Sequence, residues 1–76
     1  AWGGDSKSQL QVFLQKDGSR LPEYRVVSET GPDHAKWFAV EVYLDSNCIG
    51  KGEGTTKRHA EQEAAADALR LFGVGS

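Results

Sequence analysis

Residues 50–66 read Gly50-Lys51-Gly52-Glu53-Gly54-Thr55-Thr56-Lys57-Arg58-His59-Ala60-Glu61-Gln62-Glu63-Ala64-Ala65-Ala66. The alternating glycines are typical of a strand that another part of the backbone approaches closely, because no Cβ atom stands in the way. Thr55 or Thr56 can cap a helix, and alanine, which dominates the run behind them, has the highest helix propensity. This stretch therefore predicts a strand that turns directly into a helix.

Two cations, Lys57 and Arg58, occupy the first turn of this helix, where acidic residues are usual. The helix N-terminus already carries a partial positive charge and unpaired N–H groups, so the pair concentrates positive potential at one point. Such a site can hold an anion, most often phosphate. The alternative interpretation is that both side chains are ordinary solvated residues.

Length and composition indicate one small globular domain. The 76 residues are 38% apolar and 26% charged, which suits a folded chain with a small core. No apolar run approaches the ~20 residues of a membrane span and no signal-peptide pattern is present, so no membrane partner is expected. The single cysteine, Cys48, excludes an internal disulfide and favours a cytoplasmic or other reducing location. With 9 basic and 11 acidic residues, only a local concentration of positive charge could bind nucleic acid.

Periodicity extends the prediction to the whole chain. Residues 37–44 are typical of a strand with one buried face, because every second side chain is a large apolar one; these are Phe38, Val40, Val42 and Leu44, and Trp37, Ala39, Glu41 and Tyr43 face the other way. Leu10, Phe13 and Leu14 follow the spacing of the buried stripe of a helix. The predicted elements are a helix from a cap at Asp5 or Ser6 to about Lys16, strands at residues 24–30, 37–44 and 48–54, and a helix from about Lys57 to Phe72.

The predicted fold class is α+β, an α-β-β-β-α chain whose three-stranded antiparallel sheet is covered by both helices on one face. The open face would carry Trp37 and Tyr43, which we interpret as cross-strand packing residues rather than a stacking platform for single strands. Residues 1–5, including Trp2, are expected to be a linker remnant, 6–73 the domain and 74–76 a tail. The side chains expected in the core are Leu10, Phe13, Leu14, Phe38, Val40, Val42, Leu44, Ala60, Ala64, Ala65, Ala68, Leu69, Leu71 and Phe72.

Gln11 and Gln15 lie one turn apart on the flank of the first helix that faces away from its buried stripe, with Ser8 beside them. A glutamine amide both donates and accepts hydrogen bonds, so the pair could read hydroxyl groups and base edges. Plain surface glutamines are the alternative. His34, in the turn at residues 31–35, is either a binding residue or simply a solvent-exposed side chain.

Short motifs along the chain match, in order and spacing, those of a known family. They are Lys7–Gln11, Leu21–Tyr24, Gly31–His34, Phe38–Val42, Gly50–Gly54 and Thr56–Ala66. Together they resemble the double-stranded RNA-binding domain over about residues 7–72, and within that family the C-terminal domain of ribonuclease III. Any single motif is weakly specific, whereas all of them at the right spacing form a strong signal.

The resemblance implies binding to double-stranded RNA by its A-form shape. Such domains span ~16 base pairs and contact two successive minor grooves and the phosphates between them. The first helix would enter one minor groove and the loop after the first strand the next, while the N-terminus of the last helix would hold phosphates. The residues implied for the minor grooves are Ser8, Gln11, Gln15, Pro32, Asp33 and His34, and those for the phosphates are Thr56, Lys57, Arg58 and, peripherally, Lys51.

Glu61 departs from the family pattern, in which many members have lysine at this position. Because Glu61 follows Lys57 by one helical turn, it is expected to partly neutralise that cation and to weaken the grip on phosphate. We therefore expect modest affinity, slight sequence discrimination and a shallow salt dependence that reflects ~2–4 phosphate contacts.

No catalytic role is expected for this chain. A ribonuclease III parent would cut RNA with Mg²⁺ held by clustered carboxylates in a separate domain. Nothing in this sequence matches that acidic signature, so neither a cofactor nor a small-molecule substrate is expected. His34, Cys48 and His59 lie on three separate elements without metal-ligand spacing.

The main alternative function is a protein-interaction or dimerisation module with weak or no RNA binding, which the slightly acidic composition would suit. The presence of Gln11, His34 and the Lys57–Arg58 pair, one feature in each of the three implied regions, argues against it. As an isolated domain the chain is expected to be a monomer.

Overall fold

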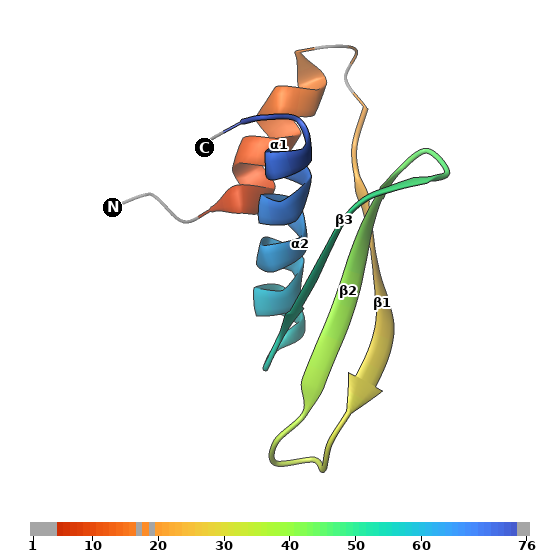
Figure 1. Ribbon diagram of the computed structural model, residues 1–76, viewed down its shortest axis with the longest axis vertical. Helices are drawn as coiled ribbons and strands as arrows, with labels where there is room; N and C mark the ends of the chain where they lie inside the picture. The colour runs from red at the N-terminus through yellow and green to blue at the C-terminus, as the bar shows by residue number, and fades with distance from the viewer. Residues whose placement is uncertain (1–4, 17, 19, 75–76) are drawn as a thin grey trace.

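The computed structural model describes residues 5–16, 18 and 20–74 and contains the predicted elements in the predicted order (Figure 1). They are α1 (Ser6–Gln15), β1 (Glu23–Thr30), β2 (Trp37–Leu44), β3 (Asn47–Gly54) and α2 (Lys57–Leu71). Each predicted boundary lies within one residue of the observed one. Trp2 lies outside the described residues.

The three strands form one antiparallel sheet in the order β1-β2-β3, and both helices lie on the same side of it (Figure 1). The register of β1 against β2 shifts between Val26 and Ser28, and that of β2 against β3 shifts between Val42 and Tyr43. Such irregularities bend a strand and increase its twist. The α+β fold predicted from the sequence is confirmed.

The aromatic residues on the open face of the sheet are engaged with neighbouring strands. Trp37 Nε1 donates a hydrogen bond to Glu53 Oε1 of β3 at 2.7 Å. The guanidinium of Arg25 on β1 lies 4.1 Å from the centre of the Tyr43 ring on β2. These are the cross-strand packing contacts expected from the sequence.

The core lies between the sheet and the two helices. Phe13 and Phe38, both expected in it, are only partly buried and pack against its edge. Val74, which falls in the expected tail, also packs against the core and donates its N–H to Leu69 O at 2.8 Å. The buried apolar residues are Leu10, Leu14, Val40, Val42, Leu44, Ile49, Ala60, Ala64, Ala65, Ala68 and Leu69.

Two of the residues predicted in the core are exposed, Leu71 to 65% and Phe72 to 38%. Leu71 lies with Asp67 and Arg70 in an open hollow along β3, which is an edge strand, so no neighbouring strand covers it. Phe72 is the C-cap of α2, and its ring contacts that of Phe13 with 5.1 Å between centroids. The last turn of α2 therefore extends past the surface that buries the rest of its apolar face.

The backbone of β3 and the backbone of α2 are in direct contact. A Cβ atom on Gly52 would lie 2.2 Å from the backbone N of Ala64, and one on Gly50 would lie 2.5 Å from Ala64 O. Ala60, Ala64 and Ala68 have no exposed surface. The alternating glycines therefore do what the sequence indicated: they leave room for the small residues of α2 to lie against the strand.

Replacing Gly52 with alanine should destabilise the fold, because the new methyl group would meet helix backbone rather than a movable side chain. Overpacking of this kind costs about 1–3 kcal/mol in the free energy of unfolding, which urea denaturation measures. The control is Lys51→Ala, an exposed side chain on the preceding residue, which should change stability by less than about 0.5 kcal/mol. Equal stability of the two variants would contradict the close approach.

Candidate nucleic-acid interface

Helix α2 begins with Thr56 as its N-cap, directly after β3. The Thr56 hydroxyl accepts a hydrogen bond from the N–H of His59 at 3.0 Å, which leaves its own hydrogen free to be donated. No acidic residue stands in the first turn, and both Lys57 and Arg58 are exposed. This end of the helix therefore presents a partial positive charge, two full charges and a hydroxyl donor.

Lys57 and Arg58 lie near different elements of the fold. Lys57 Nζ lies 4.0 Å from Glu29 Oε2 of β1 and 5.9 Å from the centre of the Phe38 ring of β2. Arg58 instead faces α1, where it lines a hollow between the two helices. This α1–α2 hollow is lined by Asp5, Lys7, Ser8, Gln11, Arg58, Glu61 and Gln62.

On α1, the predicted residues Ser8, Gln11 and Gln15 are all exposed. Gln11 lines the α1–α2 hollow together with Arg58, whereas Gln15 lies one turn further along the helix and outside that hollow. The structure thus brings the amide of Gln11 and the guanidinium of Arg58 to one depression. Gln15 extends this face of α1 away from α2's N-terminus.

The N-cap of α1 carries a strongly shifted acid. Asp5 accepts hydrogen bonds from Ser8 Oγ at 2.7 Å, from Gln62 Nε2 at 3.0 Å and from Ser8 N at 3.3 Å. These bonds, the one from the Ser8 hydroxyl first, lower the pKa of Asp5 to about 2. Because the Ser8 hydroxyl hydrogen is committed to Asp5, Ser8 offers an incoming ligand its oxygen as an acceptor.

The loop between β1 and β2 is a tight, internally bonded turn. Gly31 has a φ of +90°, which favours glycine, and a Cβ atom there would lie 2.4 Å from Ala35 O. Ala35 N donates to Pro32 O at 2.9 Å. Asp33 and His34 are therefore presented on a defined backbone, and both are exposed.

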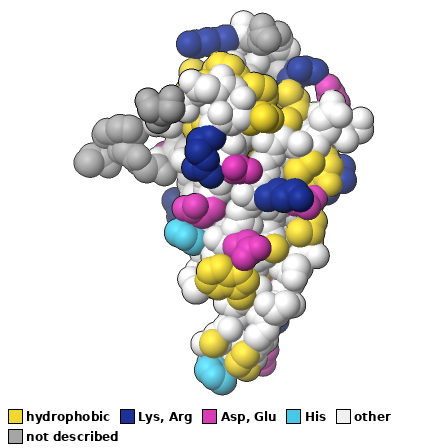
Figure 2. Space-filling view, viewed as in Figure 1, with side chains coloured by type: hydrophobic (Ala, Val, Ile, Leu, Met, Phe, Trp, Pro, Cys, Tyr) yellow, Lys and Arg dark blue, Asp and Glu magenta, His cyan; other side chains and the backbone are white. Residues whose placement is uncertain are grey.

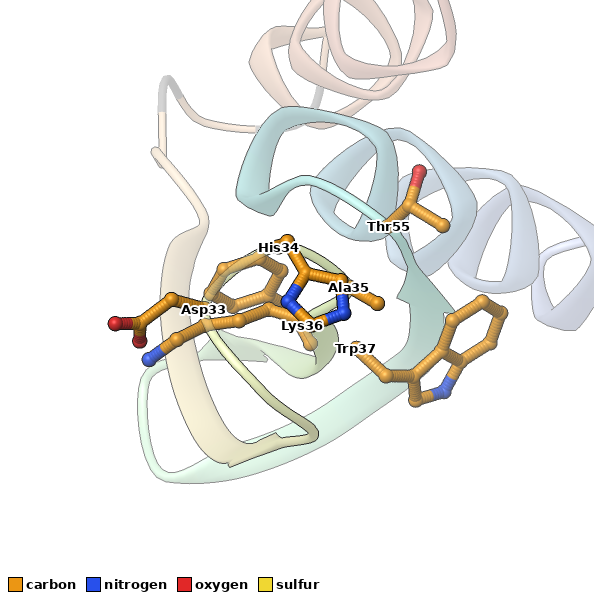
Figure 3. A pocket seen from close by; sticks show the side chains of 7 residues that line it. Asp33, His34, Ala35, Lys36, Trp37 and Thr55 are labelled. Atoms are coloured by element: carbon orange, nitrogen blue, oxygen red, sulfur yellow. The ribbon is translucent and has the colours of Figure 1, made fainter.

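This loop borders a second hollow (Figure 3). In Figure 3 the Asp33 and Lys36 side chains extend to one side of the hollow and the Trp37 indole to the other. Lys36, Trp37, Phe38 and Thr55 line this hollow although they are not among the site residues predicted from the sequence. The loop hollow is lined by Asp33, His34, Ala35, Lys36, Trp37, Phe38 and Thr55.

The N-terminus of α2 connects the two hollows. Thr55 lines the loop hollow, and Arg58, three residues later, lines the α1–α2 hollow. In Figure 1, α1, the N-terminal end of α2 and the β1–β2 loop follow one another along the long axis of the molecule. These segments, which are distant in sequence, therefore lie one after another along one edge of the molecule in this view.

Lys51 lies apart from this edge. Its backbone N–H donates to Asp67 Oδ2 at 3.0 Å, and the residue lines the hollow along β3 with Asp67 and Arg70. Since α2 rises ~1.5 Å per residue, Asp67 stands ~15 Å along the helix from Lys57. The structure does not gather Lys51 with Thr56, Lys57 and Arg58.

Glu61 does not pair with Lys57, contrary to the expectation from the sequence. Its carboxylate lies 2.6 Å from Lys7 Nζ on α1, and Lys57 has Glu29 as its acidic neighbour instead. The sequence prediction was wrong because it considered only residues on the same helix. The positive charge of Lys57 is therefore partly offset by a residue of β1 and not by one of α2.

Opposite charges are interspersed on one face of the molecule. Figure 2 shows Lys and Arg side chains interspersed with Asp and Glu side chains on the face that it presents, with no large patch of one sign.

Among the described residues, no group of three or more His, Cys, Asp or Glu side chains is placed to hold a metal ion. In the same part of the chain, neither helix has the length and apolarity that crossing a membrane requires.

Comparison with known proteins identifies relatives of the whole domain. The family model for the double-stranded RNA binding motif matches residues 6–71. The Ribonuclease 3 of Bacillus cytotoxicus is 50% identical over 66 residues, which cover 87% of this chain and 27% of that protein. The Ribonuclease 3 of Aster yellows witches'-broom phytoplasma is 49% identical over 65 residues, or 86% of this chain and 27% of that protein. The chain thus spans about a quarter of the length of these curated relatives.

A solved structure shares the fold over nearly the same span. The structure of Arabidopsis HYL1, which is described with its implications for miRNA processing, has a TM-score of 0.77 and 36% sequence identity. The match covers 88% of this chain and 94% of that one.

Replacing Asp5 with asparagine should remove part of the acid sensitivity of the fold. The folded-state pKa of about 2 lies below the ordinary value of 3.8, so the stabilisation by the Asp5 charge is present above pH 4 and is lost as the pH falls towards 2. Asparagine caps a helix about as well as aspartate but does not ionise. Urea unfolding between pH 5 and pH 2 should therefore give a steeper loss of stability for the wild type; parallel curves would contradict the assignment.

Proposed function

The chain belongs to the double-stranded RNA binding motif family, and from this premise we propose that it binds double-stranded RNA by the A-form shape of the duplex. The contact surface is the edge formed by α1, the N-terminus of α2 and the β1–β2 loop. The observation that carries the proposal is the position of the α2 N-terminus between the α1–α2 hollow and the loop hollow.

The chemistry of each part of this edge suits a different part of an RNA duplex. The wide, shallow minor groove of A-form RNA displays 2′-hydroxyls and base edges. Gln11 and Gln15 offer amides that donate and accept, and the Ser8 oxygen accepts, so α1 is suited to one minor groove. His34, on the loop that Pro32 and Gly31 hold in shape, is suited to the next.

The phosphates between the two minor grooves would meet the start of α2. Lys57 and Arg58 supply charge, Thr56 supplies a hydroxyl, and the helix N-terminus supplies backbone N–H groups. Because Lys57 and Arg58 lie near different elements, β1 and α1, they would reach different phosphates rather than one shared phosphate. Lys51 is at most a peripheral contact at the other end of α2.

Recognition of this kind depends on shape and backbone and has little sequence preference. With two cations at the centre and Glu29 and Asp33 nearby, the charge supports modest affinity and ~2–4 phosphate contacts.

The relatives extend the proposal to a parent protein. Proteins named Ribonuclease 3 are identical to this chain at about half of the aligned positions, and the chain spans only about a quarter of their length. We propose that the parent is a ribonuclease III-type endoribonuclease of the cytoplasm or another reducing compartment. In it this domain binds and positions the RNA, while a separate domain with Mg²⁺ carries out the cleavage.

Neutralising both cations at the start of α2 should abolish most of the binding. For Lys57→Gln/Arg58→Gln we expect the affinity for a ~20-base-pair RNA duplex to fall about tenfold or more near 0.1 M salt. The slope of log affinity against log salt should become shallower by about two, because two phosphate contacts are lost. A fluorescence titration at several salt concentrations measures both quantities.

The matched control is Lys16→Gln/Arg70→Gln, which changes the net charge equally but lies outside both hollows. It should retain nearly the full affinity. If both double variants bind like the wild type, the phosphate assignment is wrong. If the wild type itself does not bind the duplex, a protein-interaction or dimerisation module becomes the better description.

A DNA duplex of the same sequence should compete poorly with the RNA duplex. DNA has no 2′-hydroxyls and presents a different groove spacing, so we expect it to compete at least about tenfold more weakly in the same titration. Equal competition by the two duplexes would indicate binding through charge alone and would reject the minor-groove assignment of Gln11 and His34.

A further inference from the structure

The N-terminus of α1 is fastened to α2 by a set of polar contacts that the proposed RNA edge does not use. Gln62 Oε1 accepts a hydrogen bond from Lys7 N at 3.2 Å, and Gln62 Nε2 donates one to Asp5 Oδ1 at 3.0 Å. Lys7 Nζ lies 2.6 Å from Glu61 Oε1. We call these four residues, Asp5, Lys7, Glu61 and Gln62, the helix clamp.

Gln62 completes the first turn of α1 from outside the helix. The first N–H groups of any helix have no intrahelical partner. In α1 the N–H of Ser8 bonds to the cap residue Asp5, and that of Lys7 bonds to Gln62 of α2. The amide of Gln62 therefore holds both the cap and the first turn, and α1 obtains its complete N-terminus only when α2 is correctly placed.

Lys7 is held on two sides and is not a free cation. Besides Glu61, its ammonium lies 4.9 Å from the centre of the Tyr24 ring of β1. The Lys7 and Glu61 side chains are only 36% and 26% exposed, so solvent screens this pair less than a pair on the open surface. The clamp thus joins α1 to α2 and also contacts the sheet through Tyr24.

The clamp lies in the same hollow as the residues proposed to contact RNA. Gln11 of α1 and Arg58 of α2 line that hollow together with all four clamp residues, and Ser8 is bonded to Asp5. Helix α1 packs mainly against α2. The clamp is therefore placed to determine where the minor-groove residues of α1 stand relative to the phosphate-binding start of α2.

We propose that Glu61 and Gln62 are positioning residues for duplex binding, which act through α1 by fixing the spacing between Gln11 and the N-terminus of α2. This inference rests on the proposed function, since it concerns the same RNA edge. It assigns Glu61 a role opposite to the one expected from its charge: the carboxylate supports binding although it adds negative charge beside a phosphate site.

The sign of one substitution separates the two roles. Glu61→Gln removes a negative charge, so electrostatics alone predicts tighter RNA binding, whereas loss of the clamp predicts weaker binding. Glu63→Gln is the matched control, because it makes the same charge change on the same helix and because, within the described residues, the one ion pair of Glu63 is an exposed contact of 4.0 Å with His59. We expect Glu61→Gln to bind a ~20-base-pair RNA duplex about fivefold more weakly than Glu63→Gln.

Duplex length distinguishes positioning from general loosening of the structure. A duplex of ~8 base pairs is too short to span both minor grooves, which takes ~16 base pairs, so it engages only one part of the edge. NMR titration should give the same weak affinity for the short duplex with Glu61→Gln and with Glu63→Gln. Thermal unfolding of both variants establishes that they are folded.

Reversing the ion pair tests the contact itself. Glu61→Lys places two cations together and should bind the long duplex more weakly than the wild type, although it adds positive charge. The double variant Lys7→Glu/Glu61→Lys restores an ion pair and should recover most of the long-duplex affinity. Gln62→Leu, which removes both hydrogen bonds without changing charge, should reproduce the length-dependent loss.

The outcomes that overturn this inference are distinct from failure of the proposed function. If the wild type does not bind the long duplex, the proposed function fails. If the wild type binds and Glu61→Gln binds as tightly as Glu63→Gln or more tightly, the function stands and the clamp has no positioning role. Equal losses on the long and the short duplex would likewise reject positioning, because they indicate loosening of α1 rather than altered spacing.

Discussion

The direct contact between the backbones of β3 and α2 is the constraint on which the rest of the structure depends. Gly50 and Gly52 have no Cβ atoms, and Ala60 and Ala64 fill the small space that remains. Because only two residues separate the end of β3 from the start of α2, this contact also fixes the first turn of the helix against the sheet. The loop that joins β1 to β2 connects two strands of the same sheet. The cations of the first turn of α2 are thereby placed at a fixed distance from that loop.

Helix α1 is positioned relative to the sheet through its packing against α2. It packs mainly against α2, so its place relative to the sheet depends on α2 being seated on β3 first. Leu10 and Leu14 provide the apolar part of that contact, and the helix clamp provides the directional part at the N-terminus. Apolar packing tolerates small rotations, whereas hydrogen bonds and an ion pair specify one orientation. The arrangement is hierarchical: the sheet places α2, and α2 places α1.

The sequence predicted the elements and their order because their signals are local: alternation in β2, the helical stripe of α1, and the glycines followed by alanines at the start of α2. It failed for Leu71 and Phe72 because helical periodicity does not reveal where the covering surface ends. It misassigned Glu61 because its partner, Lys7, is 54 residues away and on another helix. It grouped Lys57 and Arg58 as one feature, although neighbours on a helix with 3.6 residues per turn point ~100° apart and here meet different elements.

The turn at the start of α2 has a consequence for the thermodynamics of association. Residues that contact a ligand from a mobile loop must lose backbone freedom when they bind, at a cost of roughly 1–2 kcal/mol for each residue. Thr56 is instead the cap of α2 and Lys57 and Arg58 begin that helix, with a single residue between Thr56 and the end of β3, so their backbone is already ordered in the free protein. Only side-chain rotamers are left to be restricted. In the proposed binding to RNA, the few cations of this turn would then retain a larger share of each contact's energy as affinity.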